Sequence, residues 1–414
     1  MPASPELPAY RRERQNQPPC VAILGAGPVG LEAALYARRL GLKTLLFERE
    51  PAVAADVRAW AHVSMFTHWE DVRTPLGELA LREAAREARR PPALPRPALY
   101  PTGGQFVEKY LEPLARLLGD SLHLETRVAA LGRSYLFPQE HDDDPQARQT
   151  RRFRLLTRSP REERIFTADY VLDASGVTHS PRWMGVGGLP ALGEMGSRGH
   201  IFYHIPDIGG RDRIHFLGKR VLLVGDGPSA ATSATLLAKL LDKDPPATLL
   251  WVSKTHAALP VPVVPRDPLP RRDVLLKKAN LLAVQGKHPR LEYLPTTQVE
   301  AVDYSLSSGR FQVTLQVDHV TRRVMVDSVI ASVGSRSDGH TFERALHPAE
   351  PGLFTLGSKA AACDHQDFLL PMARAQIRDA FRVICADPAL DLYAQAADAL
   401  GAQARLARDP APAS

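Results

Sequence analysis

The chain has 414 residues and an ordinary globular composition. Hydrophobic residues make up 44% of it and charged residues 24%, and the formal net charge is +6 at pH 7. This length allows two or three domains, each with a sizeable core. No apolar run approaches the roughly 18 residues that a membrane-spanning helix needs, so we expect no membrane partner and a cytoplasmic location.

The positive charge does not indicate a nucleic-acid partner. The arginines are scattered through predicted helices and loops, for example at Arg86 and Arg151, and no stacking aromatic residues are interleaved with them. A modest basic excess also suits an enzyme that attracts an anionic cofactor. We therefore expect a small-molecule substrate and no nucleic acid.

The first predicted element follows a polar segment, residues 1–18, which lacks the continuous hydrophobic run of a signal peptide. We expect that segment to be a disordered lead-in. The sequence VAILGAGPVGLEAALYARRLG then predicts a strand, a tight turn and a helix. In this pattern Gly25 allows a sharp turn, Gly27 followed by Pro28 leaves room for a pyrophosphate, and Gly30 lets the helix pack closely on the sheet.

The next predicted strand, KTLLFERE, ends in an acid. Glu48 stands 18 residues after Gly30, close to the roughly 20 expected for a carboxylate that accepts the two ribose hydroxyls of a dinucleotide. Glu48 and the adjoining Arg49 are therefore candidate cofactor-binding residues. From the residues alone, the first site is predicted to bind FAD or NAD.

A second fingerprint follows past the middle of the chain, in RVLLVGDGPSAATSATLLAKL. Gly225 and Gly227 repeat the glycine spacing, and Ser229 and Ala230 complete the pattern. The following strand, ATLLWVSKTH, carries no acid and ends in Ser253 and Lys254. A hydroxyl and an ammonium favour a 2′-phosphate, which a carboxylate would repel. The second site is therefore predicted to bind NADPH.

Each fingerprint is followed by hairpin-like sequence and then by an apolar strand that enters a small-residue turn. These turns are YVLDASGVT, with Gly176, and SVIASVGSRSD, with Gly334. An order of elements that occurs twice predicts two homologous α/β units. Within the second of these units, the proline-rich residues 259–273 predict a rigid surface excursion near the NADPH adenosine. This segment is also a candidate for a substrate entrance or a homodimer contact.

This layout resembles the two-dinucleotide flavoproteins, the group that holds thioredoxin reductases and the flavin-containing and N-hydroxylating monooxygenases. The blocks VRAWAHVSMFTHW, PTGGQFVEKYLEPLA, GVGGLPALGE and EPGLFTLGSKA are similar to a bacterial subfamily of uncharacterised FAD-dependent oxidoreductases. The resemblance implies an α/β fold of two Rossmann-like dinucleotide-binding domains, with the NADPH domain inserted into a discontinuous FAD domain. It implies an FAD domain at 19–195 and 341–390, an NADPH domain at 196–340, and a C-terminal tail at 391–414.

The same resemblance assigns further residues by matching blocks. It places Trp60 and His62 near the isoalloxazine as candidate catalytic residues, and Val128 against the adenine. Gly357 and Ser358 would approach the ribityl chain. A helix from about residue 368 to 376 would point its N-terminus at the pyrimidine ring of the flavin.

Cysteine spacing bears on the chemistry. The chain has three cysteines, Cys20, Cys363 and Cys385, and no pair has the C-x-x-C spacing of a dithiol relay. We expect Cys20 and Cys385 to be buried and Cys363 to follow the turn at Gly357. No cluster has metal-ligand spacing, so no metal is predicted.

The predicted function is an FAD-dependent, NADPH-consuming monooxygenase that transfers one atom of molecular oxygen to nitrogen or sulfur of a small molecule. Two alternatives remain open. One is a reductase or oxidase that acts on a quinone, a small disulfide or a protein partner. The other is a flavoprotein that binds nucleotides without turnover.

Overall fold

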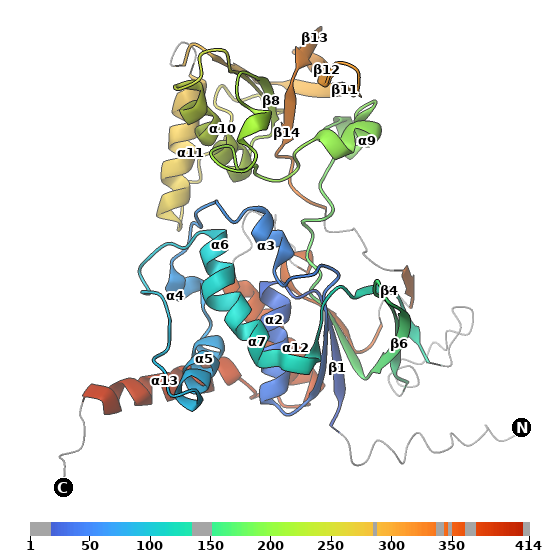
Figure 1. Cartoon of the computed structure of the whole chain (residues 1–414), viewed down its shortest axis with the longest axis vertical. Helices are drawn as coiled ribbons and strands as arrows, with labels where there is room; N and C mark the ends of the chain where they lie inside the picture. The colour runs from blue at the N-terminus through green and yellow to red at the C-terminus, as the bar shows by residue number, and fades with distance from the viewer. Residues whose placement is uncertain are drawn as a thin grey trace, which may run out of the picture.

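The structure is a computed structural model and describes residues 18–134, 151–284, 288–336, 343–346, 350–360 and 370–408. Figure 1 shows two units, a lower one that carries both ends of the chain and an upper one built from its middle. The predicted fold class, a discontinuous α/β unit with a second α/β unit inserted in it, is confirmed.

The first unit is built on a five-stranded parallel sheet in the order β16-β7-β1-β2-β3. Its last strand arrives only after the chain has passed through the second unit, which makes the first unit discontinuous. The strands are β1 (Cys20–Leu24), β2 (Lys43–Phe47), β3 (Leu122–His123), β7 (Tyr170–Asp173) and β16 (Leu353–Thr355).

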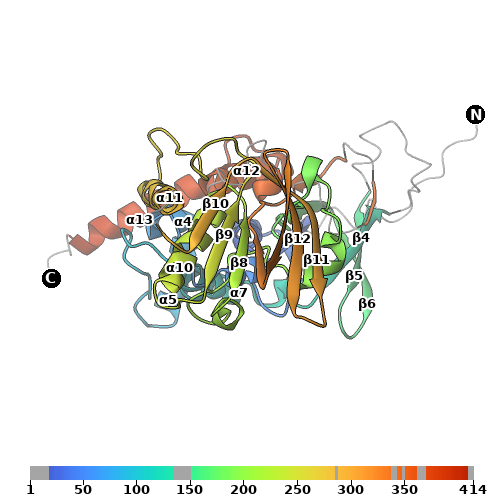
Figure 2. The ribbon, with the colours of Figure 1, turned by 90° about the horizontal axis from the view of Figure 1, so that it is seen from above.

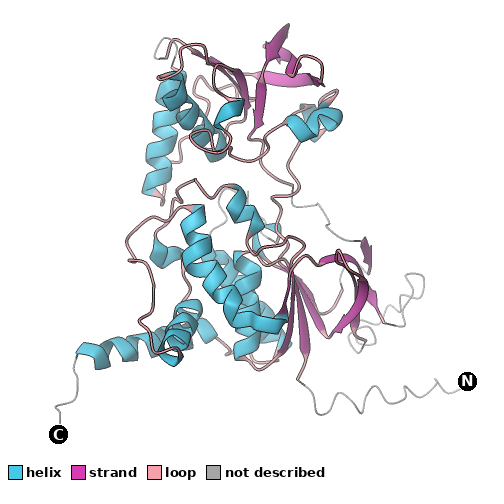
Figure 3. Cartoon of the chain, in the orientation of Figure 1, coloured by secondary structure: helices cyan, strands magenta, loops and turns pink. Residues whose placement is uncertain are grey.

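Helices cover one face of this sheet and a second sheet packs on the other, as Figure 3 shows by colour. The helices are α2 (Pro28–Arg39), α3 (Ala55–Ala59), α4 (Trp69–Val72), α5 (Pro75–Glu87), α6 (Gly103–Phe106), α7 (Glu112–Leu118), α12 (Leu370–Ile384) and α13 (Leu392–Arg408), with a π-helical turn at Val107–Leu111. The second sheet contains β4 (Arg127–Arg133), β5 (Phe153–Arg158), β6 (Glu163–Ala168) and β15 (Glu343–Ala345).

The second unit has a four-stranded parallel sheet in the order β10-β9-β8-β14, beside a three-stranded antiparallel sheet (Figure 2). Its strands are β8 (Arg220–Val224), β9 (Thr248–Val252), β10 (Leu291–Leu294), β11 (Thr297–Ser305), β12 (Arg310–Val317), β13 (Val320–Val326) and β14 (Ser328–Ala331). Its helices are α9 (Glu194–Ser197), α10 (Pro228–Leu241) and α11 (Pro270–Ala283). Short 3₁₀ turns lie at Gly119–Ser121, Val186–Gly188, Arg198–His200, Arg213–His215 and Gly357–Lys359.

The two units repeat one order of elements. In each, a strand and the helix after it are followed by a second and a third parallel strand, three antiparallel strands, and a last strand that returns beside the first. The returning strands β7 and β14 end just before the predicted turns at Gly176 and Gly334, both of which have positive φ. The predicted repetition of the order of elements is therefore confirmed.

Two neighbouring segments connect the units. The Arg182 amide donates to the Gly334 carbonyl over 2.9 Å, and the Arg336 amide donates to the Ser180 carbonyl over 2.8 Å, so the outgoing and returning chains pair as a short antiparallel ribbon. Met184 and Ala191 lie beyond this ribbon in the core of the second unit, although the predicted boundary at residue 195 assigns them to the first domain.

Residues 391–414, predicted as a C-terminal tail, contain helix α13, which packs against α5. Leu392 and Tyr393 are buried in the core of the first unit, and the Leu392 amide donates to the Tyr36 hydroxyl over 3.0 Å. The described part of this segment is thus an integral element of the first unit. Cys20 is buried as predicted, but the prediction for Cys385 is wrong, because Cys385 follows the end of α12 and is exposed.

The proline-rich segment 259–273 runs over the surface of the second unit and enters α11, where Pro270 occupies the first helical turn. The Asn280 side chain fixes it by accepting from the Val261 amide over 3.0 Å and donating to the Val261 carbonyl over 2.8 Å. Arg271 stacks on Tyr100 of the first unit, 4.6 Å from the ring centre. No helix in the described part of the chain combines the length and the apolarity that crossing a membrane requires.

Candidate functional site

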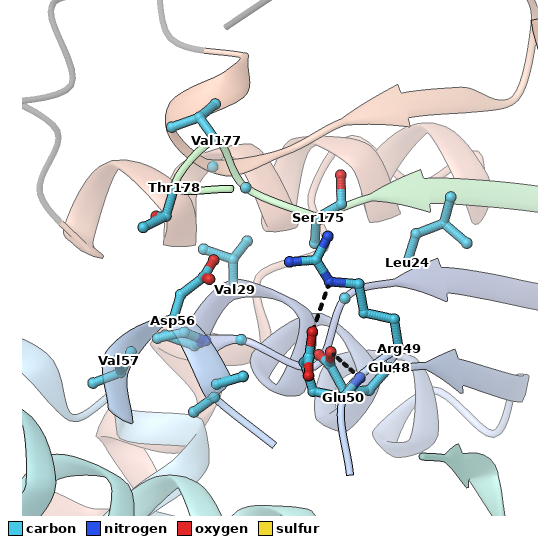
Figure 4. Close-up of a pocket in the computed structure, with 18 of the residues that line it drawn as sticks. Leu24, Val29, Glu48, Arg49, Glu50, Asp56, Val57, Ser175, Val177 and Thr178 are labelled. Atoms are coloured by element: carbon cyan, nitrogen blue, oxygen red, sulfur yellow. Dashed lines mark hydrogen bonds and ion pairs between the residues drawn. The ribbon is translucent and has the colours of Figure 1, made fainter. Parts of the chain in front are cut away.

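A cavity of about 450 Å³ lies at the carboxyl end of the parallel strands in the first unit (Figure 4). This is the edge at which open α/β sheets bind ligands. Most residues predicted for the first cofactor line it: Gly25, Gly27, Pro28, Glu48, Arg49, Trp60, Val128, Gly176, Gly357 and Ser358.

The glycines of the first fingerprint have separate physical roles. Gly25 has φ +95°, and an added Cβ would lie 2.8 Å from the Ala174 carbonyl oxygen, so the turn itself requires glycine. Gly30 is outside the cavity lining and packs on the backbone of Gly25. A Cβ added at Gly27 would meet no protein atom within 4 Å. Gly27 therefore borders open space in the cavity.

Helix α2 presents an uncapped N-terminus to this cavity. Gly27 is its N-cap and supplies no side-chain hydrogen bond, and Pro28 occupies the first turn. The remaining backbone amides of that turn have no partner inside the helix. Together with the positive end of the helix dipole, they form a site suited to a phosphate.

Glu48 is held in place by backbone amides. Its Oε2 accepts from the Ala26 amide over 2.8 Å, and its Oε1 accepts from the Glu50 amide over 3.0 Å. Burial raises the pKa of this carboxyl, while the two amide hydrogen bonds act in the opposite direction. The result is an oriented carboxyl group on the cavity wall, placed to accept hydroxyl groups.

Asp56 is a cavity residue that the sequence analysis missed. It lies in the first turn of α3 and lines the same cavity, and Figure 4 shows it on the opposite side from Arg49. Burial raises the pKa of Asp56, and the positive charge of Arg49 lowers it. Arg49 also pairs with Glu50, with 3.2 Å between Nε and Oε1. The local sequence AADVRAW contains no signal for this role.

The turn at Gly357 is held by two side chains. The Gly357 amide donates to Gln376 Oε1 over 2.7 Å, and Gln376 lies on α12. Lys359 donates to Asp173 Oδ2 over 2.9 Å in an almost fully buried ion pair. These contacts join the ends of β7 and β16, where the resemblance places the ribityl chain. The predicted helix at 368–376 is observed as α12, and Cys363 lies outside the described residues.

The two predicted catalytic residues occupy different positions. Trp60 lines the cavity, and a Cβ added at Gly103 would lie 2.6 Å from its ring, so the start of α6 packs directly on the indole. His62 is not among the lining residues, and its Nε2 is buried without a hydrogen-bond partner. Burial is the main cause that lowers the pKa of His204. His62 lies close enough to His204 to lower this pKa further.

A second cavity of about 420 Å³ lies at the corresponding edge of the second sheet. Three of the residues predicted to bind NADPH, Gly225, Ser253 and Lys254, line it. Gly227 is the N-cap of α10, and Ser229 and Ala230 lie in its first turn. The lining residues that the sequence analysis missed include Arg182, Trp183 and Asp226.

The two predicted 2′-phosphate contacts differ in exposure. Lys254 is exposed, whereas Ser253 is only 2% exposed and its hydroxyl lies 2.9 Å from the Tyr293 hydroxyl. An exposed ammonium can meet an incoming phosphate directly. Ser253 is already paired, so the electrostatic part of the predicted preference depends mainly on Lys254.

Solved structures of flavoproteins are similar to the chain over most of its length. The bacillithiol disulfide reductase of Bacillus cereus is 17% identical with a TM-score of 0.63, and the match covers 89% of this chain and 99% of that one. The ornithine N-hydroxylase of Kutzneria sp. 744 is 16% identical with a TM-score of 0.55, and the match covers 77% of this chain and 81% of that one. Thioredoxin reductase of T. acidophilum is 14% identical with a TM-score of 0.54, and the match covers 87% of this chain and 95% of that one.

The chain has the fold of these reductases and of the hydroxylase. This confirms the resemblance at the level of fold. A digeranylgeranylglycerophospholipid reductase of Picrophilus torridus is 50% identical over 44 residues, which are 11% of this chain and 11% of that protein. No family model matches the chain.

The described residues contain no group of three or more histidine, cysteine, aspartate or glutamate side chains that could hold a metal ion. Two cavities lie in the structure, one at each fingerprint.

Proposed function

We propose that the protein is an FAD-dependent, NADPH-consuming oxidoreductase, with FAD in the first cavity and NADPH in the second. The open space at Gly27 and the carboxyl group of Glu48 support a dinucleotide with free ribose hydroxyls in the first cavity. The exposed Lys254 supports a 2′-phosphate in the second.

The observation that carries the proposal is the position of the two cavities relative to each other. Ser335 lines the first cavity, and Val333, two residues earlier in the returning connection, lines the second. Two dinucleotide sites that share one short segment as a wall suit electron transfer between two bound cofactors. A protein that only stored nucleotides would not need this arrangement.

The residues of the chain would bind, orient and shield the cofactors. The N-terminus of α2 would hold the FAD pyrophosphate, and Glu48 would accept the ribose hydroxyls. Trp60, backed by Gly103, would form an apolar wall that excludes water. His62 remains a candidate for moving a proton at its Nε2. The flavin, when bound, supplies the redox chemistry.

Within this class, we favour a monooxygenase that transfers one oxygen atom to nitrogen or sulfur of a small molecule. The positions of the described cysteines support this choice. Cys20 is 1% exposed on β1 and Cys385 lies after α12, and neither lines either cavity. A dithiol relay needs a thiol within reach of the flavin.

The deciding experiment measures what happens to the electrons of NADPH. The yellow protein is mixed anaerobically with NADPH, and bleaching of the flavin absorbance would support the oxidoreductase. Oxygen is then admitted with a panel of amines, thiols and ketones. NADPH use matched by oxygenated product supports the monooxygenase, whereas matched hydrogen peroxide supports an oxidase. Absence of bleaching would support a binding role alone.

Replacing all three cysteines by serine is expected to leave flavin reduction by NADPH and oxygen consumption within about twofold of the unmodified protein, because oxygen transfer from a flavin needs no dithiol. Stopped-flow absorbance and an oxygen electrode measure the two rates. The single variant Cys363→Ser, measured for both flavin reduction and turnover, distinguishes the monooxygenase from the disulfide reductase. If it abolishes turnover while flavin reduction survives, the disulfide-reductase alternative is correct and the monooxygenase is excluded.

The unmodified protein is expected to prefer NADPH to NADH by at least about tenfold in kcat/KM, roughly 1.4 kcal/mol. The substitution Lys254→Glu should erase this preference, because it replaces the exposed ammonium of the second cavity with a charge that repels the 2′-phosphate. Steady-state flavin reduction with each nucleotide measures the ratio.

Lys243→Glu is the matched control, because Lys243 is also exposed in the second unit but does not line the cavity. It makes the same change in net charge and should keep the preference. Equal rates with both nucleotides in the unmodified protein would refute the assignment of NADPH.

A further inference from the structure

The repeated geometry of the two units allows their binding residues to be matched by position. The Gly25 amide donates to the Phe47 carbonyl in the first unit, and the Gly225 amide donates to the Val252 carbonyl in the second. Leu24 pairs with Phe47, and Val224 pairs with Val252. The residues that follow the second strands therefore correspond, and so do the residues between the first two glycines. These pairs are Glu48 with Ser253, and Ala26 with Asp226.

In the first unit these two positions are in direct contact. The Ala26 amide donates to Glu48 Oε2 over 2.8 Å, so the residue between the glycines lies beside the acid that faces the ribose. In the second unit Ser253 occupies the place of that acid, but the neighbouring position carries Asp226. The second site therefore also has a carboxylate, but it is carried by the residue between the glycines and not by the residue after the second strand.

Asp226 lines the second cavity together with Ser253 and Lys254. Burial raises the pKa of Tyr293, whose hydroxyl pairs with Ser253, and the negative charge of Asp226 acts in the same direction. Asp226 is therefore within electrostatic reach of the Ser253–Tyr293 pair. The charged residues among those that line this cavity are Arg182, Asp226 and Lys254.

We propose that Asp226 is a coenzyme-specificity residue of the second site, and this rests on the proposed binding of a nicotinamide dinucleotide there. Its carboxylate accepts the hydroxyls of the adenosine ribose and opposes a 2′-phosphate. Lys254 attracts the same phosphate from the strand end. The preference for NADPH over NADH thus depends on two opposing effects. The negative charge of Asp226 makes this preference smaller than Lys254 alone would make it.

The test uses adenosine 2′,5′-bisphosphate and 5′-AMP, which carry the adenosine half of each coenzyme and need no electron transfer. Their dissociation constants are measured by titration calorimetry on protein whose first site is saturated with FAD. Asp226→Asn removes the charge at nearly constant shape. It should shift the ratio of the two constants toward the bisphosphate by at least about tenfold.

Two further variants complete the test. Asp226→Ala copies the residue of the first unit and should shift the ratio in the same direction. Asp242→Asn, at the exposed C-terminal end of α10, makes the same change in charge at the end of that helix opposite to the cavity and should leave the ratio unchanged. An unchanged ratio in both Asp226 variants would overturn this inference and leave the proposed function intact. Failure of the unmodified protein to bind either probe would overturn both.

Discussion

The Gly27→Val protein is expected to purify colourless, with less than about a tenth of the flavin content of the unmodified protein. A Cβ at this position meets no protein atom within 4 Å, and the extended backbone there, with φ −77° and ψ −174°, accepts a β-branched residue. The fold therefore tolerates valine. The FAD pyrophosphate, which must approach this point closely, would not. Flavin absorbance relative to protein absorbance measures the loss.

Gly209→Val provides the matched control. Gly209 also has open space around its Cβ position, and it belongs to the second unit and does not line the first cavity. This variant should remain yellow. Circular dichroism and thermal unfolding in the absence of added FAD should show that both variants are folded. A fully flavin-loaded Gly27→Val protein would show that the cofactor binds elsewhere.

A second large effect is expected at Glu32, a buried residue of α2 that the sequence analysis did not single out. It is 4% exposed, and its Oε1 accepts from the Thr74 hydroxyl over 2.6 Å. Burial raises its pKa from the ordinary 4.5 to about 7, while Thr74, Arg374 and Tyr393 act in the opposite direction. This carboxyl therefore keeps its proton in the folded protein at pH values where the unfolded chain has lost it.

The sign of the pH dependence follows from this difference. Between about pH 4.5 and pH 7 the folded state binds more protons than the unfolded state, so the free energy of unfolding falls as the pH rises. The contribution of Glu32 is fully present below pH 4.5 and is lost above pH 7, and it amounts to roughly 3 kcal/mol. Glu32→Gln cannot ionise and should escape this loss.

Urea unfolding at pH 4 and pH 8 measures the effect. The stability of Glu32→Gln relative to the unmodified protein should rise by roughly 3 kcal/mol from the lower to the higher pH. Glu87→Gln, at an exposed position on α5, should follow the unmodified protein at both values. Parallel pH profiles for Glu32→Gln and the unmodified protein would contradict the buried, protonated state.

The sequence by itself determined the architecture and one wall of each cavity. Glycine spacing and apolar strands are local patterns, and they sufficed to locate β1, α2, β8, α10 and the two returning strands. The acid at Glu48 was found because its distance along the chain from Gly30 is nearly constant for this turn and helix. Its contact with the Ala26 amide confirms that the two positions are neighbours.

Only the tertiary structure decided which distant residues complete the cavities. Asp56 and Gln376 act through contacts that no local pattern encodes, because α3 and α12 are brought to the cavity by packing of the whole unit. The sequence also could not predict the partner of Ser253. Tyr293 is 40 residues away along the chain and reaches Ser253 only because β9 pairs with β10. The error at Cys385 has the same origin, because apolar periodicity predicts a buried helical face but not the residue at which the helix ends.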